Sequence, residues 1–334
     1  GGVLAWGNNS NGQLGDGTTT NNNTPVAIGL PPTITVTAIA AGAAHSLALV
    51  AIDVAFAWGG NDRGQLGDGT TTDRTTPVSV SLPPGITVTD VAAGRNHSLA
   101  VTSTGGVLAW GFNSDGQLGD GTTTDSSTPV AVNLPQGITV TAVAAGRNHS
   151  LAITSAGGVL AWGDNFFGQL GDGTTIDRST PVSVNLPEGI TATAVAASGL
   201  HSLATTSTGR LLAWGNNTQG QLGDGTTTNS SVPVAVSLPA LVTVTAVVAG
   251  GFHSLAITSA GTALAWGNNS NGQLGDGTTT DSSTPVAINL PPGFTVTTVT
   301  AGFGHSMALT TPPTSTTTMR VTHTPKQIRR GDVE

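Results

Sequence analysis

The apolar and polar positions of this chain repeat with a constant period of 52 residues. The tryptophans show the period most clearly: they are Trp6, Trp58, Trp110, Trp162, Trp214 and Trp266. Six histidines follow the same interval: His45, His97, His149, His201, His253 and His305. A period of this length is typical of stacked supersecondary units that cannot bury their apolar faces alone, so the array is the folding unit.

Each period has the pattern of four short β-strands. In one period, residues 138–145 alternate apolar residues with threonine, and residues 149–154 and 159–163 form two further apolar runs. A polar loop follows, and residues 181–186 supply a fourth strand before a Pro-Glu-Gly turn. Four strands per period predict one propeller blade, whereas a β-sandwich would not explain identical periods.

The phase of the repeats predicts how the array ends. Six periods fill residues 1–312, which begin on a third strand (3–7) and end on a second strand (305–309). We expect these two strands to pair in one blade, because that removes free sheet edges. The predicted fold is an all-β, six-bladed propeller of four-stranded antiparallel blades, closed by its terminal strands. Residues 313–334 are predicted to be a Pro/Ser/Thr linker and a basic tail.

The charge balance excludes some partners. Residues 1–312 contain six arginines, no lysine and sixteen acidic residues, a net formal charge of −10. Nucleic-acid binding depends on lysine and arginine, so we expect no nucleic-acid partner. Without cysteine there is no disulfide and no thiolate zinc site. No apolar run reaches about 18 residues, so no membrane span is expected. The chain opens on Gly1 and Gly2 without a leader pattern, which suggests a mature or excised segment.

We interpret the repeated tryptophans and histidines as structural. Each indole follows a small residue and precedes glycine, which suits a ring packed between blades. Each imidazole begins a strand, where it can bond backbone groups of the neighbouring blade. An aromatic binding ladder and a ring of metal-binding imidazoles are the alternatives, but symmetry holds the copies apart instead of converging them on one ion. We therefore expect no metal and no cofactor.

The repeated Gly-Gln-Leu-Gly-Asp-Gly segment is interpreted as a tight loop. Its spacing matches neither the dinucleotide fingerprint nor the P-loop. Paired aspartates in this loop raise calcium as an alternative: Asp68 with Asp73, Asp120 with Asp125, Asp172 with Asp177, and Asp276 with Asp281. Two carboxylates fall short of the roughly six to eight oxygens that calcium takes, so turn capping is favoured. No catalytic motif or single asymmetric set of acid, base and nucleophile is present, so we expect no enzyme.

Three motifs carry a resemblance to a known family. They are Ala-Ala-Gly-x-x-His-Ser-Leu-Ala, Gly-Val-Leu-Ala-Trp-Gly and Gly-Gln-Leu-Gly-Asp-Gly, found at 144–152, 158–163 and 168–173 and repeated through residues 1–312. The chain resembles the regulator of chromosome condensation repeat family, which implies a β-propeller, in most members seven-bladed. Six repeats instead of seven leave two alternatives, a six-bladed ring and a part of a larger array. Its members include guanine nucleotide exchange factors, chromatin-attached proteins and secreted bacterial inhibitors of β-lactamase.

The exchange-factor members are known for a wedge-like insertion in one blade. Every repeat here keeps 52 residues. The chain is therefore more similar in style to the secreted bacterial members. Because one fold hosts many functions, the resemblance does not by itself decide the function.

Two windows differ from copy to copy and are candidates for specificity. The first is the pair of residues before each repeated histidine, and the second is the four residues after each Trp-Gly. Both lie between predicted strands, where a rigid scaffold positions binding residues. Arginine and phenylalanine are typical of interface hot spots. The candidate partner-binding residues are Arg63, Arg95, Phe112, Arg147, Phe166, Phe167, Phe252 and Phe303.

The sequence therefore predicts a non-enzymatic scaffold that binds a protein partner. The resemblance to secreted members and the lysine-poor, Thr/Asn/Gly-rich body favour a bacterial protein that is extracellular or on the cell surface. Two alternatives remain open: a guanine nucleotide exchange factor for a small GTPase, and a calcium- or glycan-binding surface module.

Overall fold

The computed structural model describes residues 3–31, 33–51 and 54–312, and every regular element in these residues is a β-strand. The all-β prediction is confirmed. None of these residues forms a helix long and apolar enough to cross a membrane. The predicted linker and basic tail at 313–334 lie outside the described residues.

The strands recur in four classes that follow the period. The first strands are β3 (Val36–Ala41), β7 (Val88–Ala93), β11 (Val140–Ala145), β15 (Ala192–Ala197), β19 (Val244–Ala249) and β23 (Thr295–Ala301). The second strands are β4 (His45–Val50), β8 (His97–Thr102), β12 (His149–Thr154), β16 (His201–Thr206), β20 (His253–Thr258) and β24 (Ser306–Thr311). The third strands are β1 (Leu4–Gly7), β5 (Ala55–Gly59), β9 (Val107–Gly111), β13 (Val159–Gly163), β17 (Leu211–Gly215) and β21 (Ala263–Gly267). The fourth strands are β2 (Asn22–Ala27), β6 (Arg74–Ser79), β10 (Ser126–Ala131), β14 (Arg178–Ser183), β18 (Ser230–Ala235) and β22 (Ser282–Ala287).

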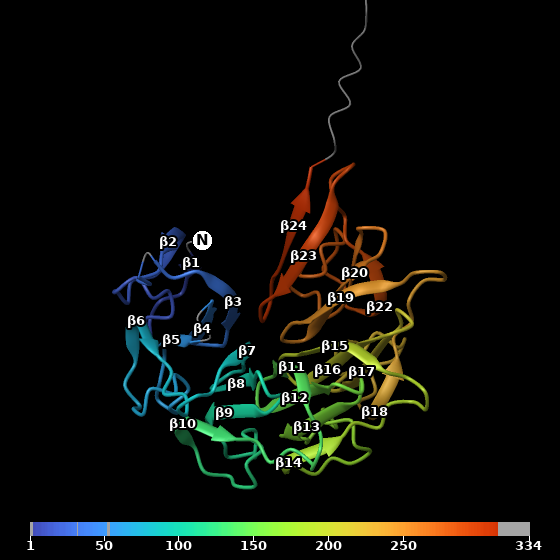
Figure 1. The fold of residues 1–334 in the computed structure, drawn as a ribbon. Coiled ribbons are helices and arrows are strands. Elements are labelled where there is room, and N and C mark those ends of the chain that lie inside the picture. The colour runs from blue at the N-terminus through green and yellow to red at the C-terminus, as the bar shows by residue number, and fades with distance from the viewer. Residues whose placement is uncertain (1–2, 32, 52–53, 313–334) are drawn as a thin grey trace, which may run out of the picture.

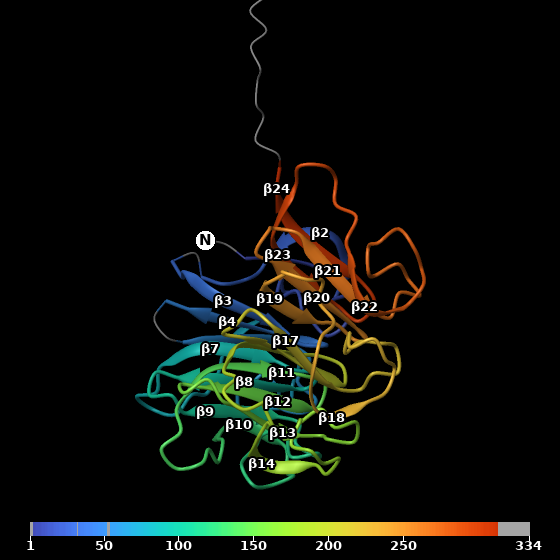
Figure 2. The same cartoon turned by 90° about the vertical axis from the view of Figure 1, so that its right-hand side faces the viewer.

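These strands form antiparallel blades arranged around an axis (Figure 1). Five sheets have four strands in chain order, namely β3–β6, β7–β10, β11–β14, β15–β18 and β19–β22. The predicted four-stranded propeller blade is therefore confirmed. The view turned by 90° shows successive sheets stacked side by side, from the blue β3 to the green β13 (Figure 2).

The strand bounds of the representative repeat match the prediction in the middle of the blade and differ at both sides: the first strand was predicted at 138–145, but β11 is Val140–Ala145. The second and third strands of the representative repeat, β12 and β13, span the predicted residues. The fourth strand was predicted at 181–186, but β14 is Arg178–Ser183. A bulge explains the difference, because the pairing register shifts between Ala161 and Gly163 and so brings Arg178 opposite Gly163. Pro181 is tolerated because β14 is an edge strand.

The hydrophobic core lies between blades and not within any one of them. Trp162 of β13 is fully buried in one cluster with Leu99 of β8 and Leu118, both from the preceding repeat. Val143 of β11 and Leu160 of β13 join the same cluster. A single repeat therefore cannot bury its own apolar face, as the period predicted.

The structure does not show the predicted closure of the ring. β1 pairs only with β2, and β23 pairs only with β24, so the expected pairing of residues 3–7 with residues 305–309 is absent. Figure 1 shows an opening between the blue N-terminal strands and the red hairpin β23–β24. The two terminal hairpins therefore remain separate two-stranded sheets, and neither completes a four-stranded blade.

The open ends expose side chains that complete blades bury. Trp6 is 52% exposed and Met307 is 47% exposed, whereas the equivalent Trp162 and Leu151 are 0% exposed. A hollow of 270 Å³ lies beside Gln273, Gly275 and Ser306. In the complete blades the position equivalent to Gly275 contacts the tryptophan of the following blade. The hollow is therefore equivalent to the site that holds a tryptophan side chain in the complete blades, and no described residue fills it.

Replacing Trp6 and Trp162 separately with alanine tests whether the ring is open in solution. Trp162→Ala should lower the free energy of unfolding by about 3–5 kcal/mol, because it empties a packed site. Trp6→Ala should lower it by less than about 1 kcal/mol, because its ring is half exposed. Urea denaturation measures both changes. An equal decrease in the free energy of unfolding for both variants would mean that Trp6 fills the hollow beside Gln273 and that the ring closes.

Candidate functional site

A backbone carbonyl in each loop joins one blade to the next. The Gln117 carbonyl accepts hydrogen bonds from the Trp162 indole nitrogen at 2.8 Å and from the Ser150 hydroxyl at 2.9 Å. Both donors belong to the blade after the loop. A Cβ on Gly119 would lie 2.8 Å from the Trp162 indole nitrogen, so only glycine leaves room for the ring. The same pair of bonds recurs at Gln13, Gln65, Gln169 and Gln221.

The repeated histidines extend this junction. His149 Nε2 lies 3.0 Å from the Ser202 hydroxyl of the next blade, and that hydroxyl donates its proton to the Gln169 carbonyl at 2.8 Å. His149 Nε2 must therefore carry the proton and donate it to Ser202. Among the described residues His149 Nδ1 has no partner, so a second proton would have no acceptor. The partner of the imidazole is a serine hydroxyl and not the backbone group expected from the sequence.

Burial keeps these histidines neutral. It lowers the pKa of His45, His149 and His253 to about 4 and that of His97 and His201 to about 3. His305, at the open edge, is exposed. In the described part of the chain no three His, Cys, Asp or Glu side chains gather as a metal site would require. The geometry gives the buried imidazoles a structural task, as donors between blades.

Each long loop is organised around a buried asparagine. This asparagine lies within the second variable window. Asn165 donates to the carbonyls of Thr174 and Ile176, both at 3.1 Å, and accepts from the Leu170 backbone N–H at 2.9 Å. Asparagine occupies this position in every copy: Asn9, Asn61, Asn113, Asn165, Asn217 and Asn269. The constant Trp-Gly-x-Asn spacing was the signal that could have identified it.

The paired aspartates cap the same loop. Asp172 accepts from the Thr174 backbone N–H at 2.9 Å and from Arg178 Nε at 3.0 Å, and Asp177 accepts from the Asn165 backbone N–H at 2.7 Å. Burial raises the pKa of Asp172, but hydrogen bonds from Thr174 and Arg178 outweigh burial and leave its pKa below the usual value. These carboxylate oxygens are therefore used in the turn-capping role that the sequence favoured.

Both variable windows lie on the same face of the propeller. The Phe112 backbone N–H donates to the Asn96 carbonyl at 2.8 Å, and that of Asp164 donates to the Asn148 carbonyl at 2.9 Å. Each bond joins the second window of a blade to the first window of that blade. We call the face that carries the two windows the loop face. The turns between second and third strands lie on the opposite face, because the strands are antiparallel.

The candidate residues of the second window meet neighbours across blades. The Arg63 guanidinium lies 5.0 Å from the centre of the Phe112 ring in the next blade. It also approaches Asp125 at 3.5 Å, with both side chains exposed. Phe166 is 73% exposed and meets the half-buried Phe167 edge to face, with ring centres 4.9 Å apart.

The candidate residues of the first window lie nearer the axis. Arg95 and Arg147 are exposed in consecutive blades. Phe303 is 74% exposed and meets the half-buried Phe252 edge to face at 5.5 Å between ring centres. The structure thus places all the candidates on the loop face, brings six of them together as three pairs, and leaves Arg95 and Arg147 outside these pairs.

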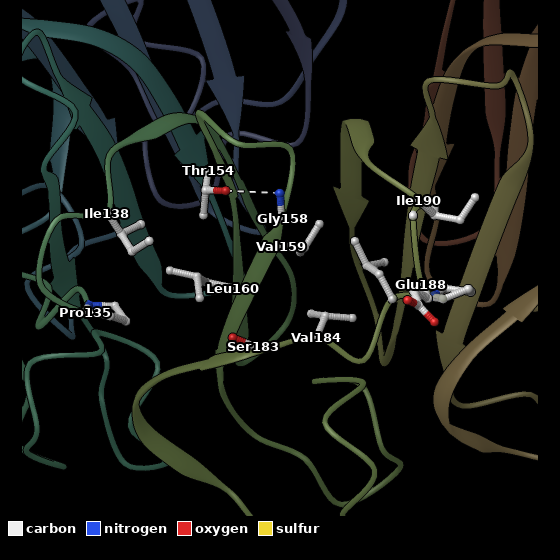
Figure 3. Close-up of a pocket in the computed structure, with 13 residues that line it drawn as sticks. Pro135, Ile138, Thr154, Gly158, Val159, Leu160, Ser183, Val184, Glu188 and Ile190 are labelled. Carbon is white, nitrogen blue, oxygen red and sulfur yellow. Dashed lines mark hydrogen bonds between the residues drawn. The ribbon is translucent and has the colours of Figure 1, made fainter.

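A hollow of 440 Å³ lies at the outer side of one blade, away from these candidates. Figure 3 shows Ile138, Leu160, Val184 and Ile190 directed toward it, with Glu188 at one side. Glu188 is the sole charged side chain that lines it. A single carboxylate beside apolar side chains does not form a catalytic constellation, so this hollow is not the candidate site.

Comparison with known proteins identifies the repeat. The model of the regulator of chromosome condensation repeat matches six times, at residues 1–49, 54–101, 104–153, 156–205, 208–257 and 260–309. The chain belongs to this repeat family. Each match ends at or just before the end of a second strand, which agrees with the phase read from the sequence.

Relatives of this repeat propeller differ widely in size and name. The chain is 33% identical to the ultraviolet-B receptor UVR8 of Arabidopsis thaliana, covering 92% of this chain and 70% of that protein. It is 32% identical to the human E3 ubiquitin-protein ligase HERC2, covering 92% of this chain but 6% of that protein.

Solved structures confirm the propeller fold. Human WBSCR16 superposes with a TM-score of 0.82 at 26% identity, over 93% of this chain and 81% of that one. Yeast RCC1 (Prp20), crystallised with Kap60, superposes with a TM-score of 0.83 at 24% identity, over 94% of this chain and 77% of that one. The likeness to yeast RCC1 concerns the fold alone.

The buried histidines predict a loss of stability in acid. They are neutral in the folded repeats, whereas in the unfolded chain they take up protons near pH 6.5. Their contribution is therefore complete above pH 6.5 and is lost as the pH falls toward about 4. Each buried imidazole should lower the free energy of unfolding by roughly 1–2 kcal/mol between pH 7 and pH 5. Urea denaturation across this range measures the effect, and a constant unfolding free energy would contradict it.

A pair of variants assigns the effect to one ring. His149→Gln removes a titrating group but keeps an N–H donor near Ser202, so unfolding should take up about one proton fewer. Leu151→Ala, which also alters a buried side chain of β12, should lower stability without changing the number of protons taken up. The number follows from the slope of unfolding free energy against pH.

Proposed function

We propose that this propeller is a non-enzymatic scaffold that binds a protein partner on its loop face. The repeated residues of each copy hold the blades and loops together, and the copies differ mainly at the exposed windows. A rigid framework that varies only in its loops is the arrangement expected of a binding module. Hot-spot residue types are concentrated in these windows.

The observation that carries this proposal is the exposure of phenylalanine where the fold does not require it. Phe166 and Phe303 are 73% and 74% exposed, while the other copies carry smaller or polar residues at both positions. Each ring packs against one neighbouring phenylalanine and leaves most of its surface in water, so it contributes little to the stability of the fold. Exposed apolar side chains beside arginine are typical of protein-binding surfaces.

The named relatives support a scaffold in general and not one partner in particular. A photoreceptor and a ubiquitin ligase both contain the repeat. This chain spans a small part of the ligase, so the match gives no reason to assign that activity to the propeller. We further propose an extracellular or cell-surface location in a bacterium, supported by the lysine-poor composition and the resemblance to secreted members.

Capture experiments with matched variants test the binding face. The immobilised chain should retain specific proteins from an extract of its source, and Phe166→Ser with Phe167→Ser should reduce this retention at least about tenfold. The melting temperature should change little, because Phe166 lies outside the core. If the double variant unfolds, Phe166→Ser alone supplies the test, since Phe167 is half buried.

A control variant on the opposite face makes the result specific. Arg210 is exposed in the turn that precedes β17, so Arg210→Glu should leave retention unchanged. Equal retention by wild type and the phenylalanine variant, or a loss with Arg210→Glu alone, would place binding elsewhere and contradict the loop-face proposal.

Nucleotide exchange is tested directly. The chain at low concentration should not accelerate GDP release from small GTPases, because no blade carries an insertion that could open a nucleotide site. Release is followed with a fluorescent GDP analogue over a panel of GTPases. Catalytic acceleration would overturn the non-enzymatic assignment and favour the exchange-factor alternative.

A further inference from the structure

Backbone hydrogen bonds join several of the turns before the histidines to the equivalent turn of the next blade. The Arg95 backbone N–H donates to the Gly146 carbonyl of the next blade at 3.3 Å, and that of Arg147 donates to the Ser198 carbonyl at 2.7 Å. Further along, the Gly251 backbone N–H donates to the Gly302 carbonyl at 3.2 Å. We call Arg95, Arg147, Leu200, Phe252 and Phe303, which project from these turns, the inner row.

One half of the inner row is cationic. In the described part of the chain three arginines pair with aspartate: Arg63, Arg74 and Arg178. Arg95 and Arg147 have no ion pair there and are exposed in adjacent blades. Two acidic side chains on the loop face have other hydrogen bonds: Asp115 accepts from the Asn148 amide at 2.9 Å, and Asp164 accepts from the Phe166 N–H at 3.0 Å. Two exposed arginines that form no ion pair among the described residues thus lie in adjacent blades of an acidic body.

The other half of the inner row is apolar. Leu200 and Phe252 are half buried, and the exposed Phe303 leans edge to face against Phe252. Phe166, in the same blade as Arg147, adds an exposed ring at the outer side of the row. The copies differ at the turns before the histidines. The equivalent turn of the first complete blade, for example, carries Ala43 and Ala44. The inner row is therefore positively charged at one end and apolar at the other.

We propose that the inner row binds a segment of a partner protein in which carboxylates lie beside aromatic or aliphatic side chains. This rests on the proposed scaffold function and specifies its partner. Carboxylates of the segment pair with Arg95 and Arg147, because each guanidinium can donate two parallel hydrogen bonds to a carboxylate. Its apolar side chains cover Phe252 and Phe303. A basic segment would meet the repulsion of the acidic body, and a nucleic acid would find two free cations among sixteen acidic residues.

Selection from a random peptide library displayed on phage tests the proposal. The enriched peptides should carry aspartate or glutamate next to phenylalanine, tryptophan or leucine. The affinity of the best peptide, measured by fluorescence anisotropy, should fall at least about tenfold in Arg95→Glu with Arg147→Glu, and also in Phe303→Ser. It should also fall with rising salt, because the arginine contacts are exposed. Arg210→Glu on the opposite face should leave the affinity unchanged.

Each contrary outcome is decisive. Enrichment of basic or uncharged peptides, no enrichment over the Arg95→Glu with Arg147→Glu variant, or an affinity indifferent to these arginines would overturn the proposal. So would a single-stranded oligonucleotide that binds the wild type and not the double variant. Proteins retained through Phe166 but unaffected by the arginine variant would leave the scaffold function standing while removing the inner row from it.

Discussion

The backbone carbonyl of the loop glutamine is the constraint on which the rest of the propeller depends. At Gln117 it accepts both the Trp162 indole and the Ser150 hydroxyl of the following blade. All three groups are buried, so leaving any of them unpaired would cost about 1–3 kcal/mol. The acceptor is a main-chain atom, so its position depends on the whole loop. The glycine spacing, the buried asparagine and the capping aspartates of that loop all keep this one oxygen in place.

A junction built this way is directional, and this explains why the ends differ from the middle. The glutamine carbonyl of each loop accepts hydrogen bonds from the following blade, and the serine of each second strand donates to the loop of the preceding blade. Gln273 has the Ser306 donor but no indole, and Trp6 has no loop carbonyl behind it among the described residues. Trp6 and Met307 are exposed at the two ends of the array, where no described blade covers them.

The sequence predicted the parts of the fold that local pattern encodes. The period followed from the spacing of equivalent residues in successive copies, and strand class and the core role of Trp162 followed from the pattern of each repeat. The serine partner of His149 did not, because Ser202 lies in the next copy and the pairing is visible only in three dimensions. The predicted closure is not seen for a related reason: strands β1 and β24 come from opposite ends of the chain, and no local pattern decides whether distant strands pair. Asn165 was missed because it lies inside a window whose other positions vary.

Each repeat uses different positions for stability and for recognition of a partner. Positions that hold the blades are the same in all copies, and a strictly symmetric ring presents every partner with equivalent faces. A single asymmetric partner needs a surface on which the copies differ. The turns before the histidines supply that difference, since Arg95 and Arg147 occupy consecutive blades while Leu200, Phe252 and Phe303 occupy the next three. Because these side chains contribute little to the junctions, they are free to vary without loss of stability, and a rigid scaffold can acquire specificity one turn at a time.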